Sequence, residues 1–159
     1  MIVRTGIGFD AHRFIEGRKL MLGGIEIPHS HGLRGHSDAD VVLHAIADAL
    51  LGAAALGDLG THFPDTDPKW KGVASSIFIT RILEMLSVDR WNISNVDTTV
   101  IAQVPKLLPH RAAIRKSIAE ILKLNETSIS IKATTSDTMG FTGREEGIAA
   151  IAVVVIQKD

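Results

Sequence analysis

The sequence has no cysteine, few aromatic residues and almost no net charge. Without cysteine, its 159 residues cannot form disulfides or the thiolate-rich zinc sites of structural metal domains. A metal in this protein must therefore be bound by His, Asp or Glu. A formal net charge of -1, with seven histidines counted neutral, provides no overall field that attracts nucleic acid or an anionic membrane surface. We expect neither as a partner.

The chain also lacks a hydrophobic run long enough for a membrane. Its longest apolar stretch, Ala45 to Leu56, is interrupted by an acid and a glycine. It is shorter than the about 20 residues that span a bilayer, so it predicts a buried helix. The N-terminal residues 2–9 lack the basic start and apolar core of a secretion signal. We expect a cytoplasmic protein with one domain over residues 1–159.

Hydrophobic periodicity predicts a mixed α/β domain. The form of a capping box at Ser37 to Asp40 indicates that a helix begins there. The last predicted strand is apolar on both faces, so we expect it to be central or to lie against a partner subunit. Residues 58–71 form a long connection, which is often functional. The predicted elements are strands over residues 2–11, 96–102, 128–135 and 148–156, a hairpin over 20–27, and helices over 41–51, 75–86 and 109–124.

Three side chains form a candidate metal site. Asp10 and His12 are two apart on the first predicted strand, so they project from the same face. His44 lies one helical turn after Asp40 and one turn before Asp48, and we expect one of these carboxylates to orient its imidazole. Two imidazoles and one carboxylate leave a tetrahedral zinc ion with one open position, as in catalytic sites.

The residues alone leave this interpretation open. Asp-x-His is a common pattern, and His44 fits equally well as a helix histidine beside solvated carboxylates. His36 and Ser37 precede a helix N-terminus, which favours an anion, but Ser37 also fits as a simple cap.

A second polar segment has two interpretations as well. Residues 132–144 gather hydroxyls, glycines and two cations around Asp137, a composition that suits a diphosphate with its counter-metal. They also fit a threonine-rich strand end followed by a glycine turn.

Taken together, the segments resemble the 2-C-methyl-D-erythritol 2,4-cyclodiphosphate synthase family of the non-mevalonate isoprenoid pathway. The motifs follow one another in the family's order and span nearly the whole chain, so their joint occurrence is far more specific than any one of them. They are Gly6-Ile7-Gly8-Phe9-Asp10-Ala11-His12, His36-Ser37-Asp38-Ala39-Asp40, residues 50–58, Phe63-Pro64-Asp65-Thr66-Asp67 and Gly140-Phe141-Thr142-Gly143-Arg144.

The resemblance implies a fold, an assembly and two kinds of metal ion. The fold is a mixed, mostly antiparallel sheet with helices on one face, assembling as a homotrimer with active sites between subunits. Asp10, His12 and His44 match ligands of Zn²⁺ or a similar divalent cation. Asp137 matches the residue that holds a second ion, Mg²⁺ or Mn²⁺, on the substrate phosphates. The family commonly has glutamate there, and the shorter aspartate leaves open whether the contact is direct or through water.

The resemblance also implies which residues contact a cytidine-diphosphate-linked substrate. His36 and Thr135 match residues that steady the transition state, and Ser37 matches a substrate contact. Phe141 and Arg144, with Phe9, resemble residues near the trimer axis, where the family can enclose a cavity for isoprenoid diphosphates. The remaining matches are the ribose-side Asp58, Leu59 and Gly60, the erythritol-side Phe63, Pro64, Asp65, Thr66 and Asp67, and the cytidine and phosphate pocket of Ala102, Gln103, Val104, Pro105, Lys106, Leu107, Leu108, Ala133 and Thr134.

The implied reaction is intramolecular, and it takes place in a bacterial cytoplasm. The 2-phosphate of the substrate attacks the β-phosphorus, closes a cyclic diphosphate and releases CMP. Two alternatives remain. A metal-dependent phosphoesterase would use a metal-bound water and give an open-chain product. A trimeric protein that binds isoprenoid diphosphates would release no CMP.

Overall fold

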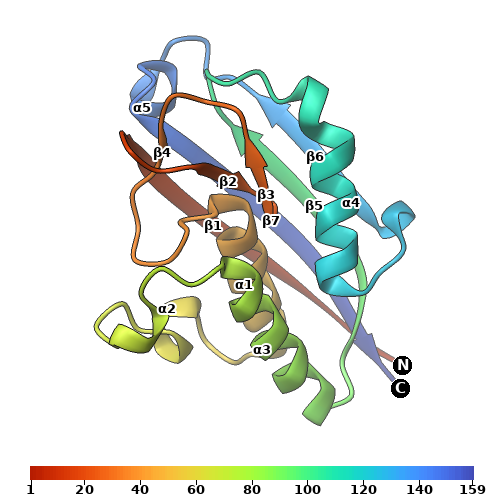
Figure 1. Cartoon of the computed structure of the whole chain (residues 1–159). Helices are drawn as coiled ribbons and strands as arrows, with labels where there is room; N and C mark the ends of the chain where they lie inside the picture. Colours follow the sequence, from red (N-terminus) through yellow and green to blue (C-terminus); the bar gives the residue numbers. More distant parts are fainter.

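A five-stranded sheet forms the centre of the fold in the computed structural model, which describes residues 1–159 (Figure 1). The strand order is β4-β1-β7-β5-β6, and every pairing is antiparallel except that of β5 with β6. The expected mixed, mostly antiparallel sheet is thus confirmed. Its strands are β1 (Ile2–Ile15), β4 (Gly32–Leu33), β5 (Asn92–Ile101), β6 (Ile129–Thr134) and β7 (Gly147–Lys158).

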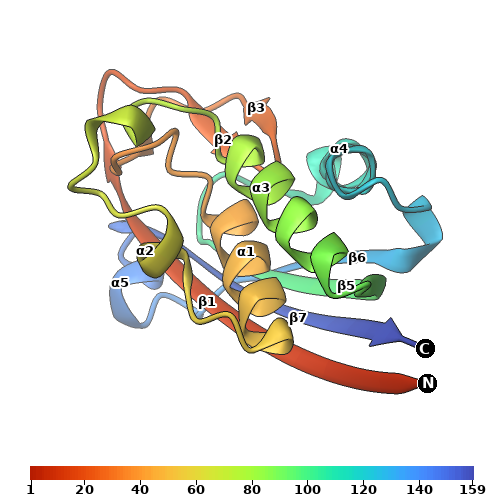
Figure 2. The same cartoon turned by 90° about the horizontal axis from the view of Figure 1, so that it is seen from below.

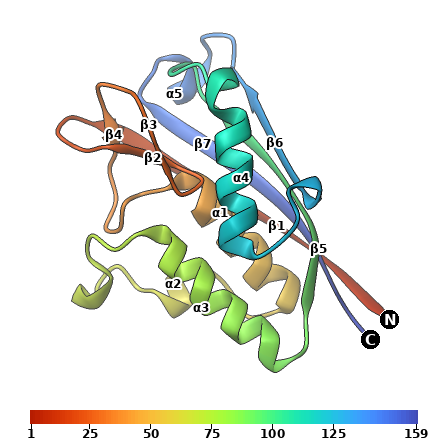
Figure 3. The ribbon, with the colours of Figure 1, turned by 45° about the vertical axis from the view of Figure 1, so that its right-hand side comes forward.

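The last strand, β7, is the central one, as its apolar sequence predicts. It pairs with β1 along its whole length, from Ile2 opposite Lys158 to Arg13 opposite Gly147, and with β5 on its other side. The two ends of the chain therefore lie side by side (Figure 3).

The three long helices cover one face of the sheet and leave the other face open (Figure 2). They are α1 (Val41–Ala54), α3 (Ser75–Val88) and α4 (Arg111–Leu122). None of the helices is both long and apolar enough to cross a bilayer. The shorter elements are the hairpin β2 (Leu20–Leu22) and β3 (Ile25–Ile27), the helices α2 (Leu59–His62) and α5 (Gly140–Gly143), and the 3-10 turns η1 (Pro68–Trp70), η2 (Leu108–His110) and η3 (Glu126–Ser128).

Helix α1 packs directly on β1 because two glycines leave room for it. A Cβ atom on Gly6 would lie 1.9 Å from the carbonyl oxygen of Ala49, and one on Gly8 would lie 2.0 Å from that of Ala45. Real atoms cannot approach so closely, so only glycine fits at these positions. The contact sets the distance between β1, which carries Asp10, and α1.

The cap of α1 differs from the one expected. Asp40, not Ser37, is the N-cap, and its carboxylate accepts from the amides of Val42 and Leu43. The same carboxylate accepts from the amides of Gly23 and Gly24, at 2.9 and 2.6 Å. Asp40 therefore ties the β2–β3 turn to the start of α1. Burial raises the pKa of Asp40, against the lowering effect of these amides.

The connection over residues 58–71 and the start of α4 differ in detail from what the sequence predicts. The long connection over residues 58–71 contains α2 and η1, because Asp58 and Asp67 each cap a short turn of helix. Helix α4 begins at Arg111 rather than at Pro109, which lies in the preceding η2 turn. Elsewhere the predicted helices and strands are present, with ends shifted by a few residues.

Candidate metal centre and substrate cavities

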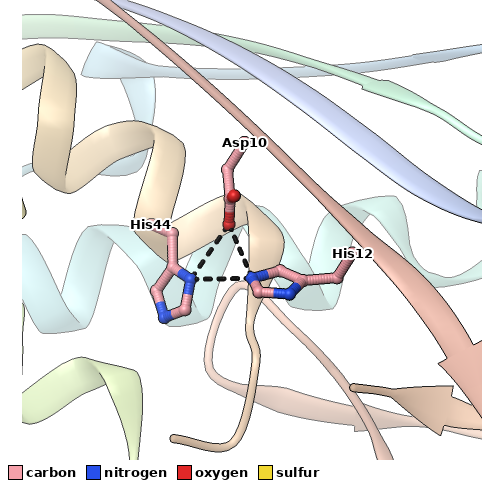
Figure 4. Close-up of side chains that lie close together, drawn as sticks. All are labelled: Asp10, His12 and His44. Carbon is pink, nitrogen blue, oxygen red and sulfur yellow. Dashed lines mark hydrogen bonds and ion pairs between the residues drawn. The ribbon is translucent and has the colours of Figure 1, made fainter. Parts of the chain in front are cut away.

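Asp10, His12 and His44 meet at one point between β1 and α1 (Figure 4). Oδ2 of Asp10 lies 2.9 Å from Nε2 of His12 and 2.9 Å from Nδ1 of His44. The two ring nitrogens are 3.2 Å apart. The period of a strand turns Asp10 and His12 to the same face, and the α1 contact brings His44 over them. The predicted set of three is therefore brought together.

The chemistry of these donors fits a divalent cation. Nδ1 of His12 lies 2.7 Å from the carbonyl oxygen of Arg34, to which it donates its proton. In the neutral imidazole, Nε2 of His12 therefore carries the lone pair, and it faces the shared point. A carboxylate and two imidazoles, with ligand atoms all within 4.8 Å of one another, match the ligand set of an open zinc site.

The three groups also perturb one another's protonation. Burial acts to raise the pKa of Asp10, but hydrogen bonds and charges from His12 and His44 outweigh it and hold that pKa well below its ordinary range. Burial acts to lower the pKa of His12, but the hydrogen bond and charge of Asp10 leave it above the ordinary 6.5. In the absence of a metal, the site therefore retains protons that a cation would displace.

The expectation that Asp40 or Asp48 orients His44 is wrong. The side chain of Asp40 is occupied by backbone amides, and that of Asp48 accepts from the amide of Leu59 at 2.7 Å. Hydroxyl groups lie beside Nε2 of His44 instead, with Oγ of Ser37 at 3.1 Å and Oγ of Ser75 at 2.9 Å. Burial raises the pKa of Asp48.

A cavity of about 590 Å³ opens beside the three ligands, and we call it the metal-site cavity. It is lined by most of the residues before Phe78 that the resemblance assigns to the metal, the substrate or the transition state. The predicted residues in its wall are Asp10, His12, His36, Ser37, His44, Leu59, Gly60, Phe63, Pro64, Asp65 and Thr66.

The aromatic wall of this cavity was not foreseen. Trp70 and Phe78 line it with Phe63, whose ring centroid lies 4.8 Å from that of Phe78 and 5.1 Å from that of Trp70. Phe78 also lies 6.0 Å from the ring of His44. The sequence offers only helical periodicity for Phe78, which indicates burial and not a site. Nε2 of His36, in the same cavity, is buried without a hydrogen-bond partner.

Arg18, for which the sequence predicted no role, holds the loop around His36. Arg18 donates to the carbonyl oxygen of Gly35 at 2.6 Å and to that of Ser37. It thus fixes the backbone on both sides of His36. Arg18 lies in the turn before β2, where a lone arginine gives no signal of this contact.

A smaller cavity of about 250 Å³ contains the predicted cytidine and phosphate segment, and we call it the Lys106 cavity. Thr135 follows the last residue of β6. Its hydroxyl lies 3.3 Å from Oδ1 of Asp137, and the side chain of Asp137 is exposed. No residue lines both cavities. The wall of the smaller one consists of Ala102, Pro105, Lys106, Leu107, Leu108, Ala133, Thr134 and Thr135.

Some predicted residues line neither cavity of the single chain. Gln103 and Val104 belong to the same turn as Lys106 but are absent from its wall. Phe141 is 40% exposed, and Arg144 pairs with Glu146 at 2.7 Å. Asp58 and Asp67 serve as helix caps, as described above. For all of these residues, a contact with substrate or with an axial cavity remains a prediction.

Comparison with known proteins supports the resemblance seen in the sequence. The pattern of the YgbB family matches residues 3–157. The 2-C-methyl-D-erythritol 2,4-cyclodiphosphate synthase of Alcanivorax borkumensis is 56% identical over 155 residues, which cover 98% of this chain and 97% of that protein. The match thus spans nearly the whole length of both proteins.

Solved structures agree with the sequence comparison. A 2C-methyl-D-erythritol-2,4-cyclodiphosphate synthase in a CDP-bound form is 36% identical, with a TM-score of 0.89, and the match covers 97% of this chain and 100% of that one. The bifunctional IspDF from Campylobacter jejuni is 41% identical, with a TM-score of 0.94; the match covers 99% of this chain and 43% of that protein. The chain therefore belongs to the YgbB family, the family of these cyclodiphosphate synthases.

Proposed function

We propose that this protein is an enzyme that cyclises 4-diphosphocytidyl-2-C-methyl-D-erythritol 2-phosphate to 2-C-methyl-D-erythritol 2,4-cyclodiphosphate. A 2-phosphate oxygen bonds to the β-phosphorus, the bond from that phosphorus to the bridging oxygen breaks, and CMP leaves with the bridging oxygen. The observation that carries the proposal is the convergence of Asp10, His12 and His44 beside a cavity, in a chain 56% identical to such a synthase. The whole chain, residues 1–159, acts as one domain.

The protein needs no general base, because the substrate carries its own nucleophile as a phosphate oxygen. Holding two groups of one molecule in line can contribute about 7 to 11 kcal/mol to catalysis. His36 is suited to this task because its buried Nε2 has no partner within the chain. Ser37 beside it, with Thr135 and Lys106 from the Lys106 cavity, would supply the other donors to phosphate oxygens.

We assign Zn²⁺ to Asp10, His12 and His44, and Mg²⁺ or Mn²⁺ to Asp137. Nitrogen donors with a single carboxylate suit zinc, whereas a carboxylate at an exposed turn suits a hard cation that keeps several waters. When bound, such ions polarise phosphoryl oxygens and neutralise the like charges of the reacting phosphates. The side chains of Asp137 and Thr135 lie 3.3 Å apart. Together they would orient the end of the diphosphate that the second ion binds.

The two cavities support an active site shared between subunits. A cytidine-diphosphate-linked polyol phosphate needs a nucleotide pocket and a metal-bound end, and no residue of the single chain lines both cavities. In the homotrimer that we propose, the Lys106 cavity of one subunit would face the metal-site cavity of its neighbour. His36 and Thr135 would then act on one substrate from different chains.

The open face of the sheet supports the same assembly. Ile7 and Phe9 on β1 are 71% and 58% exposed there, and Ile151 lies opposite Phe9 on β7. A contiguous apolar face of this kind indicates a surface that another subunit covers. Near the trimer axis, Phe9, Phe141 and Arg144 would line the cavity proposed for an isoprenoid diphosphate. The cytoplasmic location inferred from the sequence remains a prediction.

Product analysis with and without a chelator tests the proposed reaction. The purified protein, incubated with the substrate, Zn²⁺ and Mg²⁺, should release one CMP for each cyclic diphosphate, and chelation should abolish both products. His44→Ala should lose turnover while remaining folded. An open-chain product heavier than the cyclic diphosphate by one water would indicate a phosphoesterase instead. Binding of substrate without any CMP release would indicate a binding protein.

A further inference from the structure

We propose that Ser75 is a positioning residue of the metal centre and that, with Asp38, it holds His44 in the tautomer whose Nδ1 is free to bind a cation. Ser75 is the first residue of α3 and is 0% exposed. Its Oγ lies 2.9 Å from Nε2 of His44, although the two residues are 31 positions apart in the chain. Helix α3 thus contributes to a site whose ligands all come from β1 and α1.

The direction of the hydrogen bonds follows from the carboxylate. Asp38 accepts the hydroxyl proton of Ser75 through a short hydrogen bond to Oδ1. An ionised carboxylate can only accept, and a hydroxyl has a single proton to donate. Since that proton is directed to Asp38, Oγ of Ser75 is left to accept from Nε2 of His44.

This direction determines which nitrogen of His44 is free. A neutral imidazole carries one proton, so a proton on Nε2 leaves a lone pair on Nδ1. Nδ1 is the atom that lies 2.9 Å from Oδ2 of Asp10 and 3.2 Å from Nε2 of His12. The chain from Asp38 through Ser75 to His44 therefore ends at the point where the cation would bind.

Asp38 is itself fixed in place. Its amide donates to the carbonyl oxygen of Val73 at 3.0 Å, just before α3 begins. Its Oδ1 also accepts from the amide of Asp40 at 3.2 Å. The start of α3 and the start of α1 are thereby joined through the same carboxylate. A shift of either helix would break the alignment of Ser75 with His44.

Ser37 is the competing partner, and the geometry favours Ser75 over it. Oγ of Ser37 lies 3.1 Å from Nε2 of His44 and accepts from the amide of Ala39 at 3.2 Å. No carboxylate directs its proton, so either orientation of its hydroxyl is possible. Ser75 is the closer hydroxyl and the one whose proton is committed elsewhere.

The inference rests on the metal site of the proposed function but not on the reaction, and zinc binding without substrate tests it. Affinity is measured for the whole protein by competition with a chromophoric chelator. Ser75→Ala should weaken Zn²⁺ binding by roughly 10- to 100-fold, as for other groups that orient ligand histidines. Ser76→Ala, at the adjacent half-buried serine, is the matched control and should bind as the wild type does.

The Nε2–H proton of His44 is a readout that a purely structural role of Ser75 would not move. In zinc-bound wild-type protein this proton should give a downfield, slowly exchanging NMR signal, because Oγ of Ser75 accepts it. In zinc-bound Ser75→Ala the signal should move upfield and exchange faster. Asp38→Ala gives an independent variant if Ser75→Ala does not fold, and it should lower affinity in the same way. Asp38→Asn, whose amide oxygen can still accept, should retain more affinity than Asp38→Ala.

Two outcomes would overturn the proposal. One is wild-type zinc affinity and an unchanged His44 Nε2–H signal in folded Ser75→Ala. The other is a loss of affinity in Ser37→Ala alone, which would make Ser37 the partner. Failure of the proposed function is a separate result, because wild-type protein that binds zinc but releases no CMP would leave the role of Ser75 intact.

Discussion

A Cβ atom at Gly8 would lie 2.0 Å from the carbonyl oxygen of Ala45, so the ligand-bearing strand and the ligand-bearing helix touch at a position that only glycine can occupy. The other close neighbours of such an atom are also backbone atoms of α1, which cannot rotate away. The spacing of Asp10 and His12 from His44 therefore depends on this contact.

We predict that Gly8→Ala forces α1 away from β1. It should destabilise the protein by about 1–3 kcal/mol or more, as overpacking does, and should weaken zinc binding because His44 moves. Thermal unfolding and chelator competition measure the two effects. Gly52→Ala is the control in the same helix, since a Cβ there meets nothing within 4 Å. It should be neutral or slightly stabilising. Wild-type zinc affinity in Gly8→Ala would contradict the role given to the contact.

Asp40 should matter for stability rather than for catalysis. Its fully buried carboxylate is an acceptor for the amides of Gly23, Gly24, Val42 and Leu43. Asp40→Ala leaves these amides without that acceptor, and each buried unpaired group costs about 1–3 kcal/mol. We expect a loss of several kcal/mol in the free energy of unfolding.

Denaturant unfolding at fixed protein concentration measures the Asp40 effect. Asp89→Ala, at the exposed C-cap of α3, is a suitable control and should change stability little. An Asp40→Ala protein as stable as that control would show that the amides find other partners.

The metal-free centre should respond to pH through His12. Asp10 holds the pKa of His12 above 6.5 in the folded protein, so the protonated pair adds stability below that value. This stability is lost as pH rises through the higher pKa of the folded state. The stability advantage of wild-type over Asp10→Asn should therefore shrink as the pH rises from below 6.5 to above it. Thermal unfolding of the metal-free proteins across this range measures it.

Zinc affinity should change in the opposite direction. A cation must displace the proton of His12, so binding should strengthen as pH rises over the same window. An advantage over Asp10→Asn that grows toward alkaline pH in the metal-free proteins would be inconsistent with a raised His12 pKa.

Asp137 should govern the requirement for the second divalent ion. Asp137→Asn removes the charge of an exposed carboxylate beside Thr135, so the Mg²⁺ concentration for half-maximal turnover should rise roughly tenfold. Asp137→Glu supplies the residue that the family commonly has and should keep the wild-type requirement. Steady-state rates over a Mg²⁺ titration make the comparison. An unchanged requirement in Asp137→Asn would remove Asp137 from this role.

The open sheet face should be needed for the proposed trimer. Ile7→Lys places a charge at a 71% exposed apolar position of β1, so the subunits should separate and turnover should fall. Zinc binding should persist, because all three ligands come from one chain. Light scattering gives the assembly mass. Val88→Lys, at an 81% exposed position at the end of α3, is the control. A trimeric, active Ile7→Lys protein would exclude this face as the interface.

Local patterns predicted which side chains could meet at the candidate metal site, because strand and helix periods are local. The two-residue spacing of Asp10 and His12 determined their common face, and the helix placed His44 within reach. The helices and strands were predicted for the same reason, apart from their ends.

Long-range contacts were beyond local patterns. Asp40 and Ser37 are both good capping residues, and the contact that distinguishes them comes from the distant Gly23–Gly24 turn. Ser75 marks a helix start in the sequence, but its place beside His44 depends on how α3 packs against α1. The carboxylates one turn from His44 were predicted to orient it, and tertiary packing directs them to backbone amides instead.

The pairing of Ile2 with Lys158 has a consequence for how the domain can be linked to others. Asp10 lies eight residues further along β1, or about 26 Å at the rise of an extended strand. A protein fused at either end would therefore be attached well away from the candidate metal ligands and the metal-site cavity. That layout helps to explain how a bifunctional enzyme can carry this fold as 43% of its length.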